Sequence, residues 1–214
     1  MGKNVVAINA SPRARWNTAQ LVQEAARGAE DVGAQVEVVN LYQLEPFMGC
    51  RSCFACMTEK SFGRCAIKDG LTETLDKIAR ADGLILGSPN YFGRPTAGFR
   101  ALYERLCFQH LTYDLAQFSS NERSIPVLFV MASNAPDDKY DEIGYTAMIE
   151  EHVRTLERFI GPTTSFYTGD TLQTDSYDKF NWTMFDVEAK QRRHEEVFPQ
   201  ELARVRALAA ELFA

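Results

Sequence analysis

The 214-residue sequence predicts a doubly wound α/β fold, in which helices cover both faces of a parallel β-sheet. Short β-branched or apolar runs alternate with amphipathic helical patterns, as expected for successive βα units. The strand runs are almost continuously apolar, which indicates a sheet buried on both faces. No internal repeat, low-complexity tract or linker-like change of composition interrupts this order. We therefore expect a single domain over residues 1–214.

The first βα unit begins close to the start of the sequence. Residues 4–9 (NVVAIN) predict the first strand, and the loop ASPRARWN follows it. A helix comes next because apolar residues recur at helical spacing until Gly33 closes the pattern. Its expected apolar face consists of Leu21, Val22, Ala25, Ala29 and Val32. Residues 35–40 (QVEVVN) predict the second strand.

The remaining chain repeats the strand and helix alternation. A helix is expected to start near Asp69, and residues 83–87 (GLILG) predict a short buried third strand. The later elements are a helix around residues 99–107, a strand at 125–131, a helix around 148–160, a fifth strand at 164–168 and a terminal helix to Ala214. The connections at about 45–68 and 108–124 exceed ordinary loop length, which is typical of functional loops.

Composition and charge exclude several classes of function. The formal net charge of −6 argues against nucleic acid or an anionic membrane surface as a partner, since these usually need a clustered basic surface. No separate leader precedes the first strand, and no apolar run reaches membrane-spanning length. We therefore expect a soluble cytoplasmic protein whose 45% apolar residues fill one core.

The loop after the first strand predicts an anion site, because ligands of open α/β sheets bind beyond the carboxyl ends of the strands. Its candidate cofactor-binding residues are Ser11, Arg13, Asn17 and Thr18. The free N–H groups and the dipole of the following helix favour a phosphate there. The loop is neither a Walker A nor a GxGxxG sequence, which argues against triphosphate and Rossmann dinucleotide sites. A simpler alternative is that Asn17 or Thr18 caps the helix and Ser11 begins a turn.

The loops after the third and fourth strands predict the rest of a cofactor site. The loop GSPNYFGRPTAG supplies the candidates Pro89, Asn90, Tyr91, Phe92 and Gly93. Backbone amides near the glycine can donate to a heterocycle, and Tyr91 or Phe92 can cover an aromatic ring face. Ser133 and Asn134, in the loop MASNAP, are expected at the other edge of such a ring. A plain turn is the alternative for each loop.

Four of the five cysteines lie within sixteen residues, in the stretch CRSCFACMTEKSFGRC. Cys50, Cys53, Cys56 and Cys65 have the spacing C-x2-C-x2-C-x8-C, which places three thiols on one tight turn and a fourth on the returning chain. In a reducing cytoplasm such clusters indicate metal or redox chemistry. A [4Fe-4S] cluster is the first interpretation, and zinc or free oxidisable thiols are the alternatives. Cys107 lies on an apolar helical stripe and is expected in the core.

The motif SPR with a following NT, and the motif SPNYFG entering a helix, resemble those of the NAD(P)H-dependent FMN reductases of the flavodoxin-like fold. With the cysteines between these motifs, roughly residues 3–132 more specifically resemble the iron-sulfur flavoproteins. The resemblance implies a five-stranded parallel sheet of order 2-1-3-4-5, with a cysteine-rich insert at about 45–68 after the second strand. It also implies that the loop at 11–18 holds the FMN phosphate and that residues 89–93 border the isoalloxazine ring.

The first functional hypothesis is an FMN-dependent oxidoreductase or electron-transfer flavoprotein, in which a [4Fe-4S] cluster passes electrons to or from FMN. One alternative is a cluster-free NAD(P)H-dependent FMN or quinone reductase with structural or zinc-bound cysteines. Another is a non-enzymatic flavodoxin-like electron carrier. NAD(P)H is the expected electron donor, and small molecules or proteins such as a quinone or ferredoxin are the expected electron partners. No side-chain acid or base is required, so we predict no catalytic residue.

The aromatic segment SYDKFNWTMF offers apolar surface beyond the predicted core. Tyr177, Phe180, Trp182 and Phe185 can cover a flavin, pack a subunit interface or fill the core. We favour the interface and expect a homodimer or homotetramer.

Overall fold

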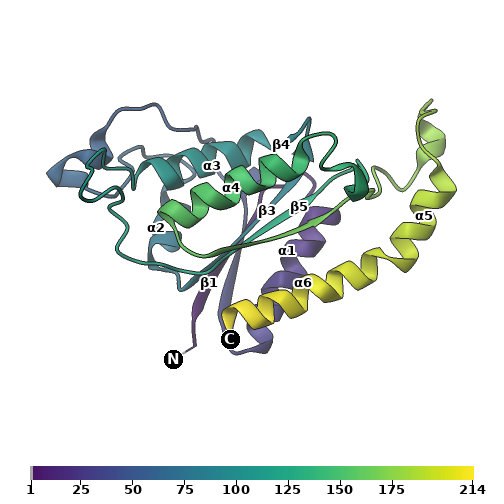
Figure 1. Cartoon of the computed structure of the whole chain (residues 1–214), viewed down its shortest axis with the longest axis horizontal. Coiled ribbons are helices and arrows are strands. Elements are labelled where there is room, and N and C mark those ends of the chain that lie inside the picture. Colours follow the sequence, from purple (N-terminus) through teal and green to yellow (C-terminus); the bar gives the residue numbers. More distant parts are fainter. Residues whose placement is uncertain (1) are drawn as a thin grey trace.

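In the computed structural model, a six-stranded sheet lies between two layers of helices (Figure 1). The structure describes residues 2–214, so Met1 of the predicted domain lies outside the described residues. The strands are β1 (Asn4–Asn9), β2 (Gln35–Asn40), β3 (Gly83–Tyr91), β4 (Arg94–Pro95), β5 (Val127–Ala132) and β6 (Thr163–Thr168). The helices are α1 (Asn17–Asp31), α2 (Thr72–Arg80), α3 (Ala97–Phe108), α4 (Tyr145–Phe159), α5 (Val187–Glu196) and α6 (Phe198–Phe213). Single 3₁₀ turns occur at Leu41–Gln43, Ala55–Met57, Glu59–Ser61, Asp137–Lys139 and Tyr177–Lys179.

Five strands run parallel in the order β2-β1-β3-β5-β6, and β4 pairs antiparallel with the end of β3. The predicted α/β fold with a parallel sheet is confirmed. The sheet has one strand more than predicted, because the predicted five strands in the order 2-1-3-4-5 did not include β4. That strand forms where Phe92 (φ 53°) and Gly93 (φ 78°) make a two-residue turn that folds Arg94 back onto Tyr91.

The two faces of the sheet bury two separate cores, because successive side chains of a strand point to opposite faces. In β1, Val5 and Ala7 pack with residues of α1 and α6. Val6 and Ile8 pack on the other face with residues of α2, α3 and α4. Figure 1 shows α1 and α6 together on one side of the strands and α3 and α4 on the other.

Several element boundaries differ from the prediction for local reasons. Helix α2 begins at Thr72 rather than near Asp69, whose carboxylate instead accepts the N–H groups of Met48 and Leu71. The predicted terminal helix is two helices, α5 and α6. Helix α6 has Pro199 in its first turn. Proline lacks the N–H that would continue the hydrogen bonds of α5 into α6, whereas α6 itself needs no N–H at this position.

This fold brings the carboxyl ends of β1, β3 and β5 to one edge of the sheet. The cysteine segment lies between β2 and α2 in the sequence, and it is at the end of the long axis of the molecule opposite to α5 (Figure 1). Within residues 2–214, no helix combines the length and the apolar character needed to cross a membrane.

Candidate functional site

A cleft of about 970 Å³ opens at the carboxyl ends of β1, β3 and β5. Its size is within the range of cofactor and ligand sites, and its position is where doubly wound sheets bind their ligands. Nine of the ten predicted cofactor-binding residues line it: Ser11, Arg13, Asn17, Thr18, Pro89, Asn90, Tyr91, Phe92 and Ser133. Gly93 is not in the lining. Its N–H donates to Asn90 Oδ1 at 2.8 Å, so it shapes the turn that presents the other residues.

The amino end of α1 forms one end of the cleft, and no side chain caps it. The N-cap residue is Trp16, so the capping role considered for Asn17 or Thr18 is not observed. Asn17 Nδ2 instead donates to the Leu172 carbonyl at 2.8 Å. An uncapped helix amino end leaves N–H groups of the first turn free to bind an anion.

Arg13 places a positive charge beside this helix end. Its guanidinium lies 4.7 Å from the ring centroid of Trp16 and donates to the Gln173 carbonyl at 2.6 Å. Partial desolvation lowers the pKa of the guanidinium from its ordinary value, but arginine stays protonated in proteins. The Arg13 backbone N–H donates to Ser11 Oγ at 3.2 Å, which fixes the turn between them. The loop therefore joins a permanent cation to an uncapped helix end.

The end of β3 and the loop after β5 contribute an unsatisfied donor and an unsatisfied acceptor. Asn90 Nδ2 and Asn134 Oδ1 are buried without any hydrogen-bond partner, and both residues line the cleft. Buried polar atoms are normally paired, so these two point to a ligand with complementary polar groups. Ser133 is fixed beside them by the hydroxyl of Tyr140, which lies 2.9 Å from Ser133 Oγ. Burial raises the pKa of Tyr140 to about 12, which keeps this hydroxyl protonated.

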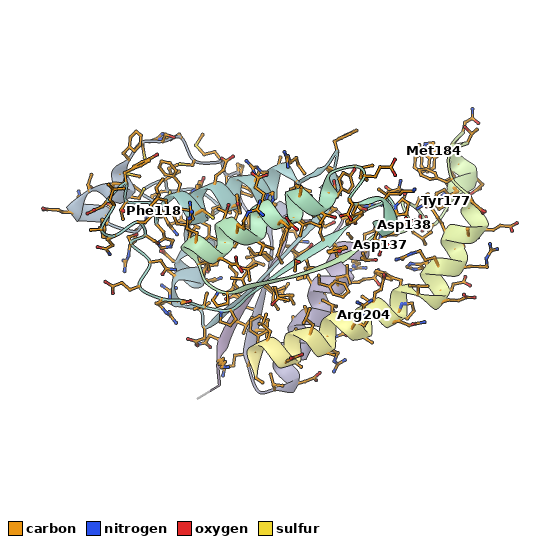
Figure 2. All side chains as sticks on the ribbon, viewed as in Figure 1. Phe118, Asp137, Asp138, Tyr177, Met184 and Arg204 are labelled. Atoms are coloured by element: carbon orange, nitrogen blue, oxygen red, sulfur yellow. The ribbon has the colours of Figure 1, made fainter. Side chains whose placement is uncertain are left out.

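Residues after β6 form a wall of the cleft, and none of them is among the ten predicted cofactor-binding residues. Trp182, Met184 and Phe185 line the cleft, and Phe180 stacks on Trp182 with ring centroids 4.3 Å apart. Figure 2 shows Met184 and Tyr177 at the same end of the molecule as Asp137. Covering a flavin is one of the three roles that the sequence predicts for Trp182 and Phe185, although a subunit interface is the favoured one. The order of the loops along the chain gave no sign that this segment returns to the cleft.

A buried lysine, Lys190, fixes the same wall through several polar contacts, and the sequence did not predict it as a site residue. Lys190 Nζ lies 2.6 Å from Asp170 Oδ1, and 3.4 Å from the carbonyl oxygens of Asn134 and Thr171. Only 6% of the Lys190 side chain is exposed. This ammonium group therefore joins α5 to the loops after β5 and β6. Nothing in the sequence around Lys190 distinguishes it from a solvated helix residue.

The four clustered cysteines line a second, much smaller cavity. Cys56 is buried, Cys50 and Cys65 are half-buried, and Cys53 is exposed, and all four are free thiols. A hydrogen bond from the Ala55 N–H lowers the pKa of Cys53, whereas burial raises the pKa of Cys56. In the part of the chain that the structure describes, no group of three or more His, Cys, Asp or Glu side chains is arranged to hold a metal ion. The predicted ligands are therefore brought to one cavity, but not into ligand geometry.

The donor set around this cavity fits an iron-sulfur cluster. Four thiols with no carboxylate or imidazole among them are the usual ligands of a [4Fe-4S] cluster. The chain turns tightly here, with Ser52 (φ 50°) and Phe54 (φ 57°) both in the left-handed region. Cys107 lies outside this cavity, and its place in the core is confirmed by 6% exposure. Burial raises the pKa of its thiol to about 12.

Comparison with protein families and curated proteins gives consistent matches. The family described as NADPH-dependent FMN reductase matches residues 3–135. An iron-sulfur flavoprotein of Methanocaldococcus jannaschii is 40% identical over 103 residues, which are 47% of this chain and 50% of that protein. One of Archaeoglobus fulgidus is 34% identical over 101 residues, which are 47% of each. The chain spans about half the length of these curated relatives.

Solved structures show the same fold at low sequence identity. An NAD(P)H:quinone oxidoreductase from Methanothermobacter marburgensis has a TM-score of 0.63 and 15% identity, with 99% of this chain and 98% of that chain covered. An FMN-dependent NADH-azoreductase from Bacillus anthracis, in complex with FMN, has a TM-score of 0.66 and 14% identity over 100% of both chains. These likenesses show a flavodoxin-like α/β fold.

Proposed function

Because the chain belongs to the NADPH-dependent FMN reductase family, we propose that it is an FMN-dependent oxidoreductase that binds FMN in the cleft. We further propose that Cys50, Cys53, Cys56 and Cys65 hold a [4Fe-4S] cluster that exchanges electrons with the flavin. The observation that supports FMN most directly is the convergence of three separate loops on one cleft that holds an unpaired buried donor and acceptor. Bound FMN would supply the conversion between hydride transfer and single-electron transfer.

The residues of the cleft divide by the part of FMN whose chemistry they match. The uncapped amino end of α1, with Arg13 and Thr18, matches the phosphate. The unpaired Asn90 Nδ2 and Asn134 Oδ1 match the alternating donors and acceptors of a flavin ring edge. Trp182 and the neighbouring wall offer an apolar surface for the ring. No residue of the cleft is needed to transfer a proton in this proposal.

The proposal of a cluster is supported by the four thiols at one cavity and by the curated relatives, which are named iron-sulfur flavoproteins. The cluster would carry single electrons. Cys65 is separated from the other three ligands by eight residues, but the fold returns it to the same cavity. A cluster-free reductase with zinc-bound cysteines makes the opposite prediction about iron, so the two functions can be separated directly.

The experiment is purification and reconstitution without oxygen, followed by visible absorption, flavin extraction, and iron, sulfide and zinc analysis. We expect one FMN, and about four irons and four sulfides, per chain, as a [4Fe-4S] cluster requires. Oxidation of NADPH and NADH by the loaded protein then tests enzymatic turnover against a carrier role. Protein that takes up zinc and FMN but no iron would establish the cluster-free reductase instead.

We also propose that the protein self-associates. Phe180, Trp182 and Met184 are 46%, 42% and 82% exposed at the rim of the cleft, which is unusual for large apolar side chains next to a cofactor site. A second copy that covers them would also shield the cleft from water. Sedimentation of the FMN-loaded protein at micromolar concentration tests this directly, and a monomer there would contradict the proposal.

A further inference from the structure

One fully buried arginine joins the cysteine cavity to the rest of the protein. Arg105 lies near the end of α3, and none of its side chain is exposed. Its Nε–H donates to Cys65 Sγ at 3.3 Å, while Nη1 lies 2.7 Å from both carboxylate oxygens of Asp69. The remaining contacts are to the carbonyl oxygens of Met48 (3.3 Å) and Ile67 (3.0 Å). The guanidinium thus contacts both chain segments that flank the cysteines.

The direction of the Nε–H bond is not explained by charge pairing alone. The pair with Asp69 already balances the buried charge through Nη1, and the two backbone carbonyls accept from the outer nitrogens. The Nε–H is nevertheless aimed at a sulfur. Gln109, one residue beyond α3, accepts the Cys65 N–H at 3.1 Å through its side-chain oxygen. The end of α3 therefore fixes both the backbone and the sulfur of Cys65.

We propose that Arg105 is a positioning residue for the iron-sulfur cluster, which holds Cys65 as the fourth thiolate ligand and stabilises the reduced cluster through the Nε–H···Sγ bond. This inference depends on the proposed function, because it presupposes the cluster. Reduction adds negative charge that is spread over the sulfurs, and hydrogen bonds to cluster sulfurs are a main determinant of the reduction potential. A bond from a buried cation is stronger than one from a neutral donor.

The test compares the same substitution at two positions of α3. Arg105→Lys keeps a cation for Asp69 but has no rigid fork that reaches Asp69 and Cys65 together. Arg100→Lys is the matched control, because Arg100 lies on the same helix, pairs with Glu104 and with the ring of Tyr103, and does not line the cysteine cavity. Iron, sulfide and FMN content are measured first, and the midpoint potential of the cluster is then measured by electron paramagnetic resonance during a redox titration.

We expect Arg105→Lys to keep FMN and the full cluster but to shift the cluster toward the oxidised form. The expected change in the reduction equilibrium is about tenfold, which equals about 59 mV for a one-electron couple. Arg100→Lys should match the wild type. A full cluster with an unchanged potential in Arg105→Lys would overturn the inference, since a purely structural pair with Asp69 would be restored by lysine.

A second measurement decides the case in which Arg105→Lys loses its cluster. The otherwise wild-type protein is labelled with ¹⁵N in the arginine guanidinium groups, with Arg51→Lys introduced because Arg51 lies beside Cys53. A ¹⁵N coupling to the reduced cluster in pulsed resonance spectra supports the inference, and its absence overturns it. Wild-type protein that binds FMN but no iron would instead overturn the proposed cluster, and this inference with it. Iron content of the wild type therefore separates the two failures.

Discussion

The double substitution Arg13→Ala with Thr18→Val is expected to weaken FMN binding strongly and riboflavin binding little. Both residues line the cleft at the uncapped amino end of α1, and riboflavin differs from FMN by lacking the phosphate. Thr18 is only 2% exposed, so valine is used to remove the hydroxyl without leaving a cavity. The two changes therefore remove one cation and one hydroxyl from the proposed phosphate site.

The magnitude follows from the exposure of the two groups. A hydrogen bond to a charged group contributes about 1.5 to 3 kcal/mol. Arg13 is exposed, so solvent screening places its contribution at about the lower value, whereas the buried Thr18 hydroxyl can reach the upper value. The sum of about 3 to 4.5 kcal/mol corresponds to a loss of FMN affinity of about 100-fold to 2,000-fold.

The assay is titration of the flavin-free protein with FMN and with riboflavin, followed by flavin fluorescence. Arg15→Ala is the matched control, because Arg15 carries the same charge on the same loop, is exposed and does not line the cleft. Arg13 also donates to the Gln173 carbonyl, so its loss could loosen the cleft wall instead. That effect would lower the affinity for both flavins equally, and equal losses would therefore refute a phosphate site at this loop.

Three further outcomes are expected. Replacing any of the four clustered cysteines by Ala should lower iron content sharply while extractable FMN stays, whereas Cys107→Ala should keep both; loss of FMN along with iron would contradict the separation of the two sites. Lys190→Met should lower the melting temperature by about 4 to 8 °C, because about 2 kcal/mol of the free energy of unfolding is lost when Asp170 is left partly buried without its cation. Adding Asp170→Asn should recover most of this loss, as measured by calorimetry. Burial lowers the pKa of His110 to about 4, so the unfolded chain binds a proton below pH 6.5 that the folded chain does not bind until about pH 4. The free energy of unfolding should fall by up to about 3 kcal/mol as pH drops through this window; an unchanged slope in His110→Gln, measured by urea unfolding, would exclude His110 as the cause.

The central strands β1, β3 and β5 could be predicted because their sequences are almost continuously apolar, and the edge strands β2 and β6 because short β-branched or aromatic runs stand between helical patterns. The strand β4 could not, since its two residues include Pro95 and its turn uses Phe92, a residue that rarely adopts positive φ. The division of the terminal helix was also missed. Val197 and Phe198 continue the apolar pattern across the break, and only Pro199 marks it.

The nine cleft residues that the sequence identified all lie at the carboxyl end of β3 or in the segments that directly follow β1, β3 and β5, including the first turn of α1. Parallel topology alone brings such loops to one edge, so their meeting requires no knowledge of the packing. The wall around Trp182 and Lys190 depends on how a long connection after β6 folds back, which is decided by tertiary contacts such as Lys190 with Asp170.

The two sites are connected by a single helix whose two ends are fixed in different ways. At the cleft end of α3, Thr96 Oγ1 donates to the Ala10 carbonyl at 2.9 Å and accepts the Phe99 N–H. At the other end, Arg105 and Gln109 hold Cys65. From residue 97 to residue 105 a helix rises about 12 Å, so α3 acts as a rigid spacer between the β3 loop and the cysteine cavity. The two cavities have no lining residue in common, so a local change in one site should leave the cofactor of the other in place, and the iron and flavin measurements are separable.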